Sequence, residues 1–273
     1  MPKHAFIPPD QWAKRLARPK KYHSAVNERG LNAAPRPESA TLEAFCPAPY
    51  DQGSLGSCTA NAFCGAYRTL AKKNGKDVDF QPSRLYLYFQ ERLLEDPAHR
   101  PTDLTDSGAD VGDGTSYVQK KGICSESSWP YDVSKYNQVP PPNCDQEAIG
   151  HKISRYHQIP VDSNLLANIE PTIAGGSPVL IGIDVYDSFE SDAVAQTGLV
   201  PVPNPHKWGN PHDSRDAYAG GHEMCLVGYD RTKRLFTVLN SWGDKWGKSG
   251  LCFIPYDYLA NPHIHGEFTV FQL

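Results

Sequence analysis

The hydrophobic pattern of the chain is helical in its first half and strand-like in its second. Between Ser57 and Asn74 apolar residues recur at three- and four-residue spacing, and Gly75 follows as a helix stop. Further helices are expected over 82–95, 112–121 and 163–174. From Pro178 onward five short β-rich runs predict strands: VLIGIDVY, EMCLVGYD, LFTVLN, LCFIPY and EFTVFQL. Helices followed by strands indicate an α+β protein with two lobes, and such a boundary commonly forms a cleft.

Composition excludes several classes of protein. With 273 residues, 39% hydrophobic and 21% charged, the chain is neither disordered nor fibrous. Its 24 prolines and 22 glycines indicate many loops, which we expect over 34–52, 129–145 and 200–213. No apolar run approaches the roughly 18 residues of a membrane span. A net charge of −4 does not favour general binding of nucleic acid.

The charge is divided unevenly along the chain. Residues 1–33 carry a net charge of +5, and residues 34–273 carry −9. A basic extension can dock electrostatically on an acidic body, although a solvated tail fits the same charges. The first residues lack the apolar region of a secretory leader, so we expect a cytoplasmic protein, or a secreted one if a leader has been removed.

Seven cysteines are an odd number, so one thiol stays free even if six pair, and that thiol is a candidate nucleophile. In a reducing compartment most of them act as small buried hydrophobes. Cys225 and Cys252 fall on strands that we expect to be neighbours. Either a disulfide or two buried thiols fits this pair.

Cys58 ends a glycine-rich run, Gln52-Gly-Ser-Leu-Gly-Ser-Cys58, at the start of the strongest predicted helix. The first turn of a helix offers unpaired N–H groups and the positive end of the dipole, which both favour a thiolate. A turn could return the Gln52 amide to the sulfur, where it and the Cys58 N–H would donate to a developing oxyanion. A buried structural cysteine is the alternative.

Two further motifs lie in the strand-rich half. Gly221 precedes His222 directly before a strand, where glycine lets a substrate backbone approach and the imidazole can exchange a proton with a thiol. Asn240 ends the next strand, so a hairpin would place its carbonyl beside His222 and orient the ring. Trp242 could cover that contact. An ordinary surface histidine and core tryptophans are the alternatives.

The motifs occur in one order and together resemble the papain family of cysteine proteases over about residues 34–273: Gln52…Gly56-Ser57-Cys58, Gly221-His222 and Asn240-Ser241-Trp242-Gly243. The resemblance implies a papain-like two-lobe α+β fold. A helical N-terminal lobe and an antiparallel, β-barrel-like C-terminal lobe would enclose a cleft. Residues 34–273 would form the catalytic domain, and residues 1–33 a basic extension.

The resemblance also implies roles for single residues. Cys58 would be the nucleophile, His222 the acid–base partner, Asn240 the orienting residue and Gln52 the oxyanion donor, acting on peptide or protein substrates without metal or cofactor. Other positions would bind substrate: Ser107, Gly108 and Ala109 along its backbone, Val111 in the wall of the pocket for the second residue before the scissile bond, and Gly221 and Trp242 beside the catalytic groups.

Some positions depart from the family pattern. Leu55 and Thr59 stand where relatives usually have a cysteine and an aromatic residue, so one familiar disulfide is absent. Exopeptidase relatives carry histidines on inserted loops, and residues 124–150 contain none, which favours an endopeptidase. Ubiquitin-type isopeptide cleavage or acyl transfer would use the same groups. A silenced protease acting as a binding protein is a third hypothesis, disfavoured by the four intact residues.

The extension over residues 1–33 is shorter than the prosegments of this family. Its net charge of +5 against −9 for the rest would help it to cross the cleft as a plug. We therefore expect a zymogen in which this extension inhibits the catalytic domain.

Overall fold

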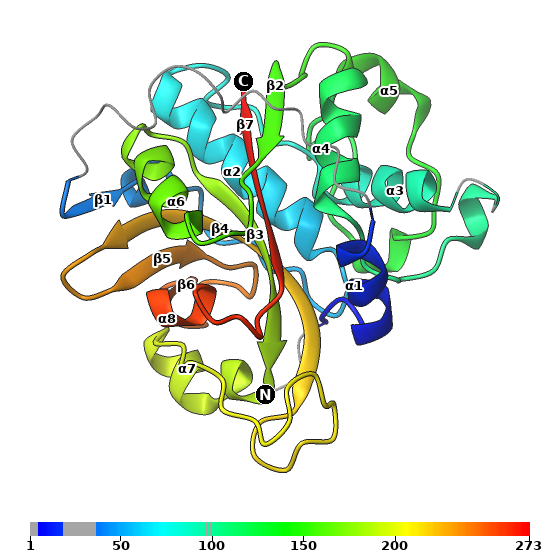
Figure 1. The fold of residues 1–273 in the computed structure, drawn as a ribbon. Coiled ribbons are helices and arrows are strands. Elements are labelled where there is room, and N and C mark those ends of the chain that lie inside the picture. The colour runs from blue at the N-terminus through cyan, green and yellow to red at the C-terminus, as the bar shows by residue number, and fades with distance from the viewer. Residues whose placement is uncertain (1–4, 19–36, 97, 99) are drawn as a thin grey trace.

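The structure is a computed structural model that describes residues 5–18, 37–96, 98 and 100–273 (Figure 1). Its helices are α1 (Pro9–Leu16), α2 (Cys58–Asn74), α3 (Arg84–Glu95), α4 (Val111–Lys120), α5 (Pro142–Ala148), α6 (Leu165–Ala174), α7 (Asp192–Thr197) and α8 (Tyr256–Leu259). Its strands are β1 (Ser39–Thr41), β2 (Arg155–Gln158), β3 (Val179–Tyr186), β4 (Tyr218–Asp230), β5 (Leu235–Leu239), β6 (Leu251–Pro255) and β7 (Gly266–Gln272). None of the helices in these parts of the chain is long and apolar enough to cross a membrane.

Helix α2 is the long helix that the apolar spacing predicts. Its residues are buried from Cys58 to Ala71, and it ends at Gly75, whose φ of 65° is a left-handed conformation that favours glycine. Figure 1 shows α3, α4 and α5 gathered on one side of α2. Side chains of these four helices form one hydrophobic core with the nearest face of the sheet.

The strands form one open antiparallel sheet in the order β2-β7-β3-β4-β5-β6, and β1 pairs with β4. Along β4 the side chains alternate, so that Cys225 and Val227 pack in the core of α2 while Met224 and Leu226 pack in a second core. That second core also takes side chains from α6, α7 and α8. The expectation of an α+β fold with helices and strands segregated is confirmed, although the sheet does not close into a barrel.

Two details differ from the predicted elements. Helix α5 lies largely within the range 129–145 predicted as a loop, because Pro142 at its first position fits a helix start as well as a loop. Helix α1 lies within the range predicted as a basic extension, of which residues 1–4 and 19–33 lie outside the described residues. All seven cysteines are free thiols, including Cys225 and Cys252.

Helix α1 is positioned between the two halves of the fold. Figure 1 shows it beside the ends of α3 and α4 and next to β4. Ile7 and Trp12 form a third, small apolar cluster with Cys58, and Leu16 packs against it. The N-terminal segment, residues 5–18, therefore lies over the start of α2, where the sequence predicts the reactive thiol.

Candidate active site

Cys58 begins α2, and its side chain is fully buried. The backbone of Glu223, the residue after His222, forms a hydrogen bond with the thiol. Burial raises the pKa of the thiol to about 12, and this hydrogen bond lowers it by less. In this arrangement the thiol is protonated, because burial outweighs the help of the helix N-terminus.

The hairpin of β4 and β5 brings His222 and Asn240 together. His222 lies within β4, and Asn240 directly follows β5. The distance between His222 Nε2 and Asn240 Oδ1 is 2.8 Å. Asn240 Oδ1 also accepts from the backbone N–H of Ser241 at 2.8 Å, which identifies it as the oxygen. His222 Nε2 therefore carries a proton, which leaves Nδ1 as the basic nitrogen of the neutral ring.

Trp242 covers the imidazole from one face. The Trp242 and His222 rings are stacked at 25°, with their centroids 4.8 Å apart. Phe189 packs edge-on against Trp242, at 5.7 Å between centroids. This apolar cover excludes water from the bond between His222 and Asn240 and strengthens it.

The Gln52 amide is held at both of its ends. Its Oε1 accepts from Ser241 Oγ at 2.6 Å, and its Nε2 donates to the carbonyl oxygens of Leu55 at 3.0 Å and Ala5 at 3.1 Å. Because Ser241 occupies the oxygen end, the NH₂ group faces the Ala5 carbonyl. The Ala5 carbonyl oxygen therefore accepts from the same amide group that the sequence predicts to donate to the substrate oxyanion.

The backbone of the N-terminal segment pairs with the residue before His222. Ile7 N–H donates to Gly221 O at 2.9 Å, and Gly221 N–H donates to Ile7 O at 3.0 Å. Ile7 is fully buried, and Phe6 meets the His222 ring edge-on at 5.7 Å between centroids. Gly220 has a φ of 130°, and a Cβ there would lie 2.2 Å from Ile7 O. The glycines of this motif therefore leave room for a peptide backbone.

Trp12 fills the space beside Gly182 and Gly221. A Cβ on Gly221 would lie 2.3 Å from the Trp12 ring, and a Cβ on Gly182 would lie 2.7 Å from it. The indole N–H donates to Asp184 Oδ1 at 2.7 Å, and the whole side chain is buried. The absence of a side chain at these two glycines therefore makes room for the ring, whose single polar atom is paired.

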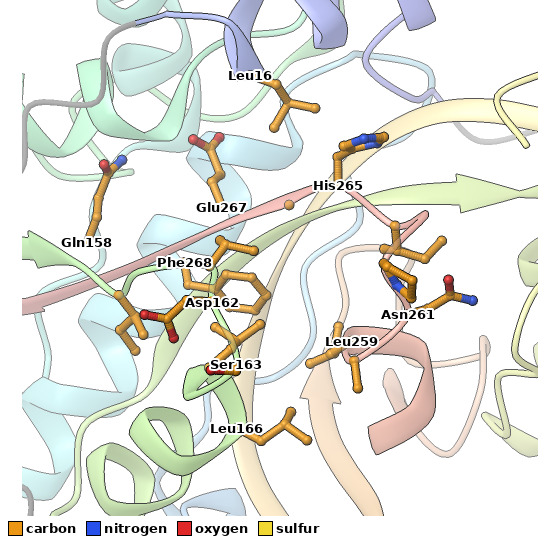
Figure 2. Close-up of a pocket in the computed structure, with 17 residues that line it drawn as sticks. Leu16, Gln158, Asp162, Ser163, Leu166, Leu259, Asn261, His265, Glu267 and Phe268 are labelled. Atoms are coloured by element: carbon orange, nitrogen blue, oxygen red, sulfur yellow. The ribbon is translucent and has the colours of Figure 1, made fainter.

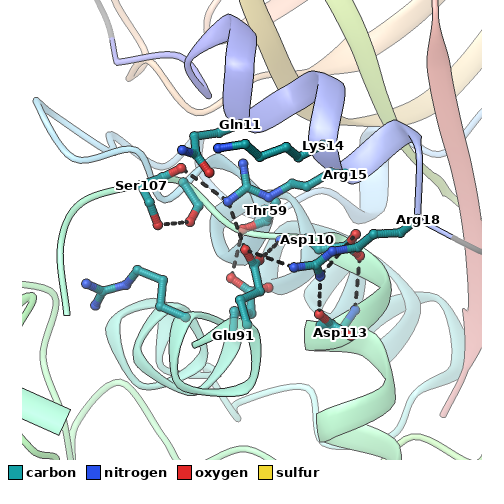
Figure 3. A network of polar contacts seen from close by, with 12 residues as sticks. Gln11, Lys14, Arg15, Arg18, Thr59, Glu91, Ser107, Asp110 and Asp113 are labelled. Carbon is teal, nitrogen blue, oxygen red and sulfur yellow. Dashed lines mark hydrogen bonds and ion pairs between the residues drawn. The ribbon is translucent and has the colours of Figure 1, made fainter. Parts of the chain in front are cut away.

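The C-terminal half of α1 is held by charges (Figure 3). Arg15 Nη2 lies 3.0 Å from Glu95 Oε2 and 3.2 Å from the carbonyl oxygen of Ser107. Arg18 Nη1 lies 2.8 Å from Asp113 Oδ2 and 3.9 Å from Asp110 Oδ2. Basic side chains of the segment therefore meet acidic side chains at the ends of α3 and α4.

The predicted strip for substrate backbone lies partly under the same segment. A Cβ on Gly108 would lie 3.0 Å from the Ile7 side chain, and Ser107 accepts from Arg15. Ala109 and Val111 are each 1% exposed and pack in the core of the helical half. The structure thus brings Ser107 and Gly108 to the N-terminal segment and places Ala109 and Val111 in the adjoining core.

A separate pocket of about 700 Å³ lies beside the C-terminal end of α1. Figure 2 shows Leu16, Gln158, Glu267 and His265 around it, with Phe268 deeper in its apolar part. In the part of the chain that the structure describes, no three His, Cys, Asp or Glu side chains are grouped so as to hold a metal ion.

Sequence reasoning did not identify Trp12 of the N-terminal segment, nor the three acidic residues that the segment contacts: Glu95, Asp113 and Asp184. The unequal charge of the two parts of the chain was the one available signal, and it predicts docking without naming partners. Arg15 and Glu95 are 80 positions apart, and Arg18 and Asp113 are 95 apart. Such pairs follow from the fold and leave no local pattern.

Comparison with known proteins agrees with this geometry. A profile described as papain family cysteine protease matches residues 43–264. An uncharacterised peptidase C1-like protein of Acanthamoeba polyphaga mimivirus is 35% identical over 227 residues, which are 81% of this chain and 68% of that protein. Cathepsin K of Mus musculus is 26% identical over 212 residues, and this chain spans 54% of its length.

Solved structures give the same result. The crystal structure of xylellain, a cysteine protease from Xylella fastidiosa, has a TM-score of 0.74 at 30% identity, covering 90% of this chain and 89% of that one. A digestive procathepsin L 3 of Tenebrio molitor, with a TM-score of 0.66 at 22% identity, shares the fold and covers 97% of this chain and 79% of its own. The profile spans most of the chain, so this protein belongs to the papain family of cysteine proteases.

Proposed function

We propose that this chain is a cysteine endopeptidase that uses Cys58 as its nucleophile. The Cys58 thiol transfers its proton to His222 Nδ1, and the thiolate attacks the carbonyl carbon of the scissile peptide bond. The oxyanion is stabilised by the Gln52 Nε2 amide and the Cys58 N–H. Asn240 supports this role, since its bond at 2.8 Å keeps His222 in the tautomer whose Nδ1 is unprotonated.

The second half of the reaction regenerates the thiol. His222 Nδ1–H protonates the leaving amine, the C–N bond breaks, and the acyl group remains on Cys58 as a thioester. His222 then removes a proton from water, and the hydroxide attacks the thioester carbonyl. The acid product leaves, and the departing thiolate takes the proton back from His222. Every proton in this sequence passes through one imidazole nitrogen.

The same chain is proposed to be latent while its N-terminal segment is bound. The observation that carries this proposal is the hydrogen bond of 3.1 Å from Gln52 Nε2 to the Ala5 carbonyl. A substrate carbonyl needs the same donor, so Ala5 and substrate exclude one another. The full burial of Cys58 and its raised pKa also support latency, since burial keeps substrate from the sulfur and the raised pKa keeps the thiol protonated.

The test uses an internally quenched peptide blocked at both ends, which an endopeptidase cleaves and an exopeptidase does not. We expect little cleavage by the full chain and strong cleavage by full-chain variants whose segment is weakened at Trp12. Cys58→Ala in the weakened variant should abolish cleavage, and Cys58 in that variant should be labelled by a thiol-reactive epoxide, as measured by mass spectrometry.

The outcomes separate the two parts of the proposal. Equal cleavage by the full chain and the weakened variant discards latency and keeps the protease. Cleavage that survives Cys58→Ala discards the nucleophile. No cleavage by any variant, with Cys58 unlabelled and ubiquitin conjugates also intact, favours a binding protein.

A further inference from the structure

Three carboxylates converge where α3 ends and α4 begins. Glu95 is the last residue of α3, Asp110 caps α4, and Asp113 lies in its first turn. Glu95 Oε1 accepts the backbone N–H of Asp110 at 2.5 Å, and Asp110 Oδ1 accepts the N–H of Gly112 at 2.8 Å. Backbone N–H groups therefore fix one carboxylate oxygen of Glu95 and one of Asp110. The other oxygen of each faces the guanidinium groups of Arg15 and Arg18.

That space already holds a ligand, which is the chain's own pair of guanidinium groups (Figure 3). Arg15 is 2% exposed and donates one bond to Glu95 and one to Ser107 O, both from Nη2. Its Nε and Nη1 are buried without a hydrogen-bond partner. The site therefore takes a guanidinium, although Arg15 uses one of its three nitrogens there.

The carboxylate at the base of this site needs a cation. Burial raises the pKa of Glu95, whereas Arg15 and Arg18 lower it. When the segment leaves, both cations leave with it, and Glu95 keeps three acidic neighbours on α3 and α4: Glu91, Asp110 and Asp113. Burial, and then the nearby carboxylates of Glu95, Asp110 and Asp113, raise the pKa of Glu91 well above its ordinary value, which favours its neutral form.

The site adjoins the strip predicted to bind the substrate backbone. Ser107, whose carbonyl accepts from Arg15, precedes Gly108, and Gly108 packs against Ile7. Asp110 directly follows Ser107, Gly108 and Ala109, the three residues predicted to bind along the substrate backbone. A substrate side chain in this site therefore belongs to the acyl side of the substrate, two or three residues before the bond that is cut.

We propose that Glu95, Asp110 and Asp113 form a substrate subsite for a basic side chain, arginine above lysine, at the second or third residue before the scissile bond. This inference rests on the proposed protease function. Arginine is favoured because its planar group donates several bonds in fixed directions to carboxylate and carbonyl oxygens, as Arg15 does. The N-terminal segment is then held at this site by imitating the charge of the substrate.

The experiment compares arginine with citrulline, its uncharged isostere. The enzyme is the full chain carrying Trp12→Ala, Arg15→Ala and Arg18→Ala, so that no guanidinium of its own fills the subsite. The substrates are blocked tripeptidyl aminomethylcoumarin amides that differ only in Arg or citrulline at the second or third residue before the amide. We expect kcat/KM for the best arginine substrate to exceed its citrulline partner about tenfold, the size of one charge-assisted hydrogen bond.

Glu95→Gln in this background should bring the arginine-to-citrulline ratio towards one. Asp257→Asn removes the same charge from an exposed pair with Arg234 and should leave the ratio unchanged. Efficient cleavage of both substrates at a ratio near one overturns the subsite and keeps the protease. No cleavage of either substrate, with no epoxide label on Cys58, overturns the protease and the subsite with it.

A second measurement does not depend on the folding of a Glu95 variant. A synthetic peptide of residues 5–18 should inhibit the same enzyme, and replacing its Arg15 with citrulline should weaken inhibition about tenfold. Replacing its Lys14, whose side chain is 69% exposed, with norleucine should have little effect. Equal inhibition by the Arg15 and citrulline peptides overturns recognition of the positive charge.

Discussion

The two halves of the N-terminal segment are bound by different physical forces. Residues 5–12 are held by a hydrogen bond from the Gln52 side chain to the Ala5 carbonyl, by backbone hydrogen bonds between Ile7 and Gly221, and by burial of Ile7 and Trp12. Residues 13–18 are held mainly by Arg15 and Arg18 against carboxylates. The first half covers Cys58 and His222, and the second half holds the helix by its charge. We therefore expect the first half to supply most of the binding free energy and the second half its dependence on salt.

This difference follows from solvation. Trp12 leaves water completely and leaves no polar atom unpaired, so its burial is a net gain. Arg15 loses its hydration on binding, and its attraction to Glu95 is offset by that loss. The following predictions test the contrast, from the largest expected effect to the smallest.

The reactivity of Cys58 should depend most strongly on the apolar half. With a pKa of about 12, against 9.0 for an ordinary cysteine, the thiolate fraction at pH 8 is reduced about a thousandfold. Alkylation of Cys58 in the full chain should therefore rise about tenfold per pH unit from pH 8 to 11 without reaching a plateau. Trp12→Ala should accelerate it at pH 8, as measured by mass spectrometry of the Cys58 peptide.

The raised pKa of Cys58 also makes the free energy of unfolding depend on pH in a definite direction. The folded chain holds the Cys58 proton more firmly than the unfolded chain, so this contribution to stability is complete below pH 9 and is lost as the pH rises towards 12. Cys58→Ala should therefore lose less unfolding free energy between pH 9 and 11 than the parent chain. An identical loss in both proteins contradicts the raised pKa.

Trp12→Ala should activate the full chain. Removing a buried tryptophan costs about 3 kcal/mol of segment binding, which corresponds to a rise in kcat/KM of up to about a hundredfold. The measurement is initial hydrolysis of a fluorogenic peptide amide. Trp208→Ala removes a tryptophan that stacks on His263 instead, and it should not activate. A rise of equal size in both variants would show general loosening of the fold.

Arg15→Ala should activate less, by about tenfold. When the segment binds, the attraction between Arg15 and Glu95 is partly cancelled by the cost of taking both charges out of water, so the pair contributes less binding free energy than Trp12 does. Lys14→Ala removes the same charge from an exposed position on the same helix and serves as the control. The readout is the same peptide hydrolysis. If Arg15→Ala activates more than Trp12→Ala, the assignment of strong and weak halves is reversed.

Salt should produce the smallest effect. The contact between Arg18 and Asp113 is 39% exposed on both sides, so it contributes less than about 1 kcal/mol and is screened. Raising NaCl from about 0.05 to 0.5 M should increase hydrolysis by the full chain about twofold, relative to the Trp12→Ala variant. The increase should vanish in Arg15→Ala/Arg18→Ala, and its persistence there would assign it to other charges.

Local sequence pattern was sufficient for part of the fold and of the site. The spacing of apolar residues predicts α2, and Gly75 ends it because a left-handed residue closes a helix at little cost to glycine. The order of two strands and a turn predicts that Asn240 lies beside His222, and the atoms are 2.8 Å apart. These features depend on neighbours in sequence or on adjacent strands.

The rest depends on contacts between distant parts of the chain. Trp12 and Asp184 are 172 positions apart, so nothing near either residue indicates that they meet. Helix α1 has only eight residues and marginal stability alone, and its basic side chains are typical of a solvated tail. Val111 packs in the core of the helical half, and short motifs alone do not show which side of the start of α4 faces that core.

The bound segment is part of the same polypeptide as the groups that it covers. Its concentration at the site is therefore set by the length of the connecting chain and not by the amount of protein present. Diluting such a protein does not release the segment, and a second molecule is not required to hold it in place. Under the proposed latency, activation takes either a cut in the connection or a competitor whose binding exceeds that local concentration.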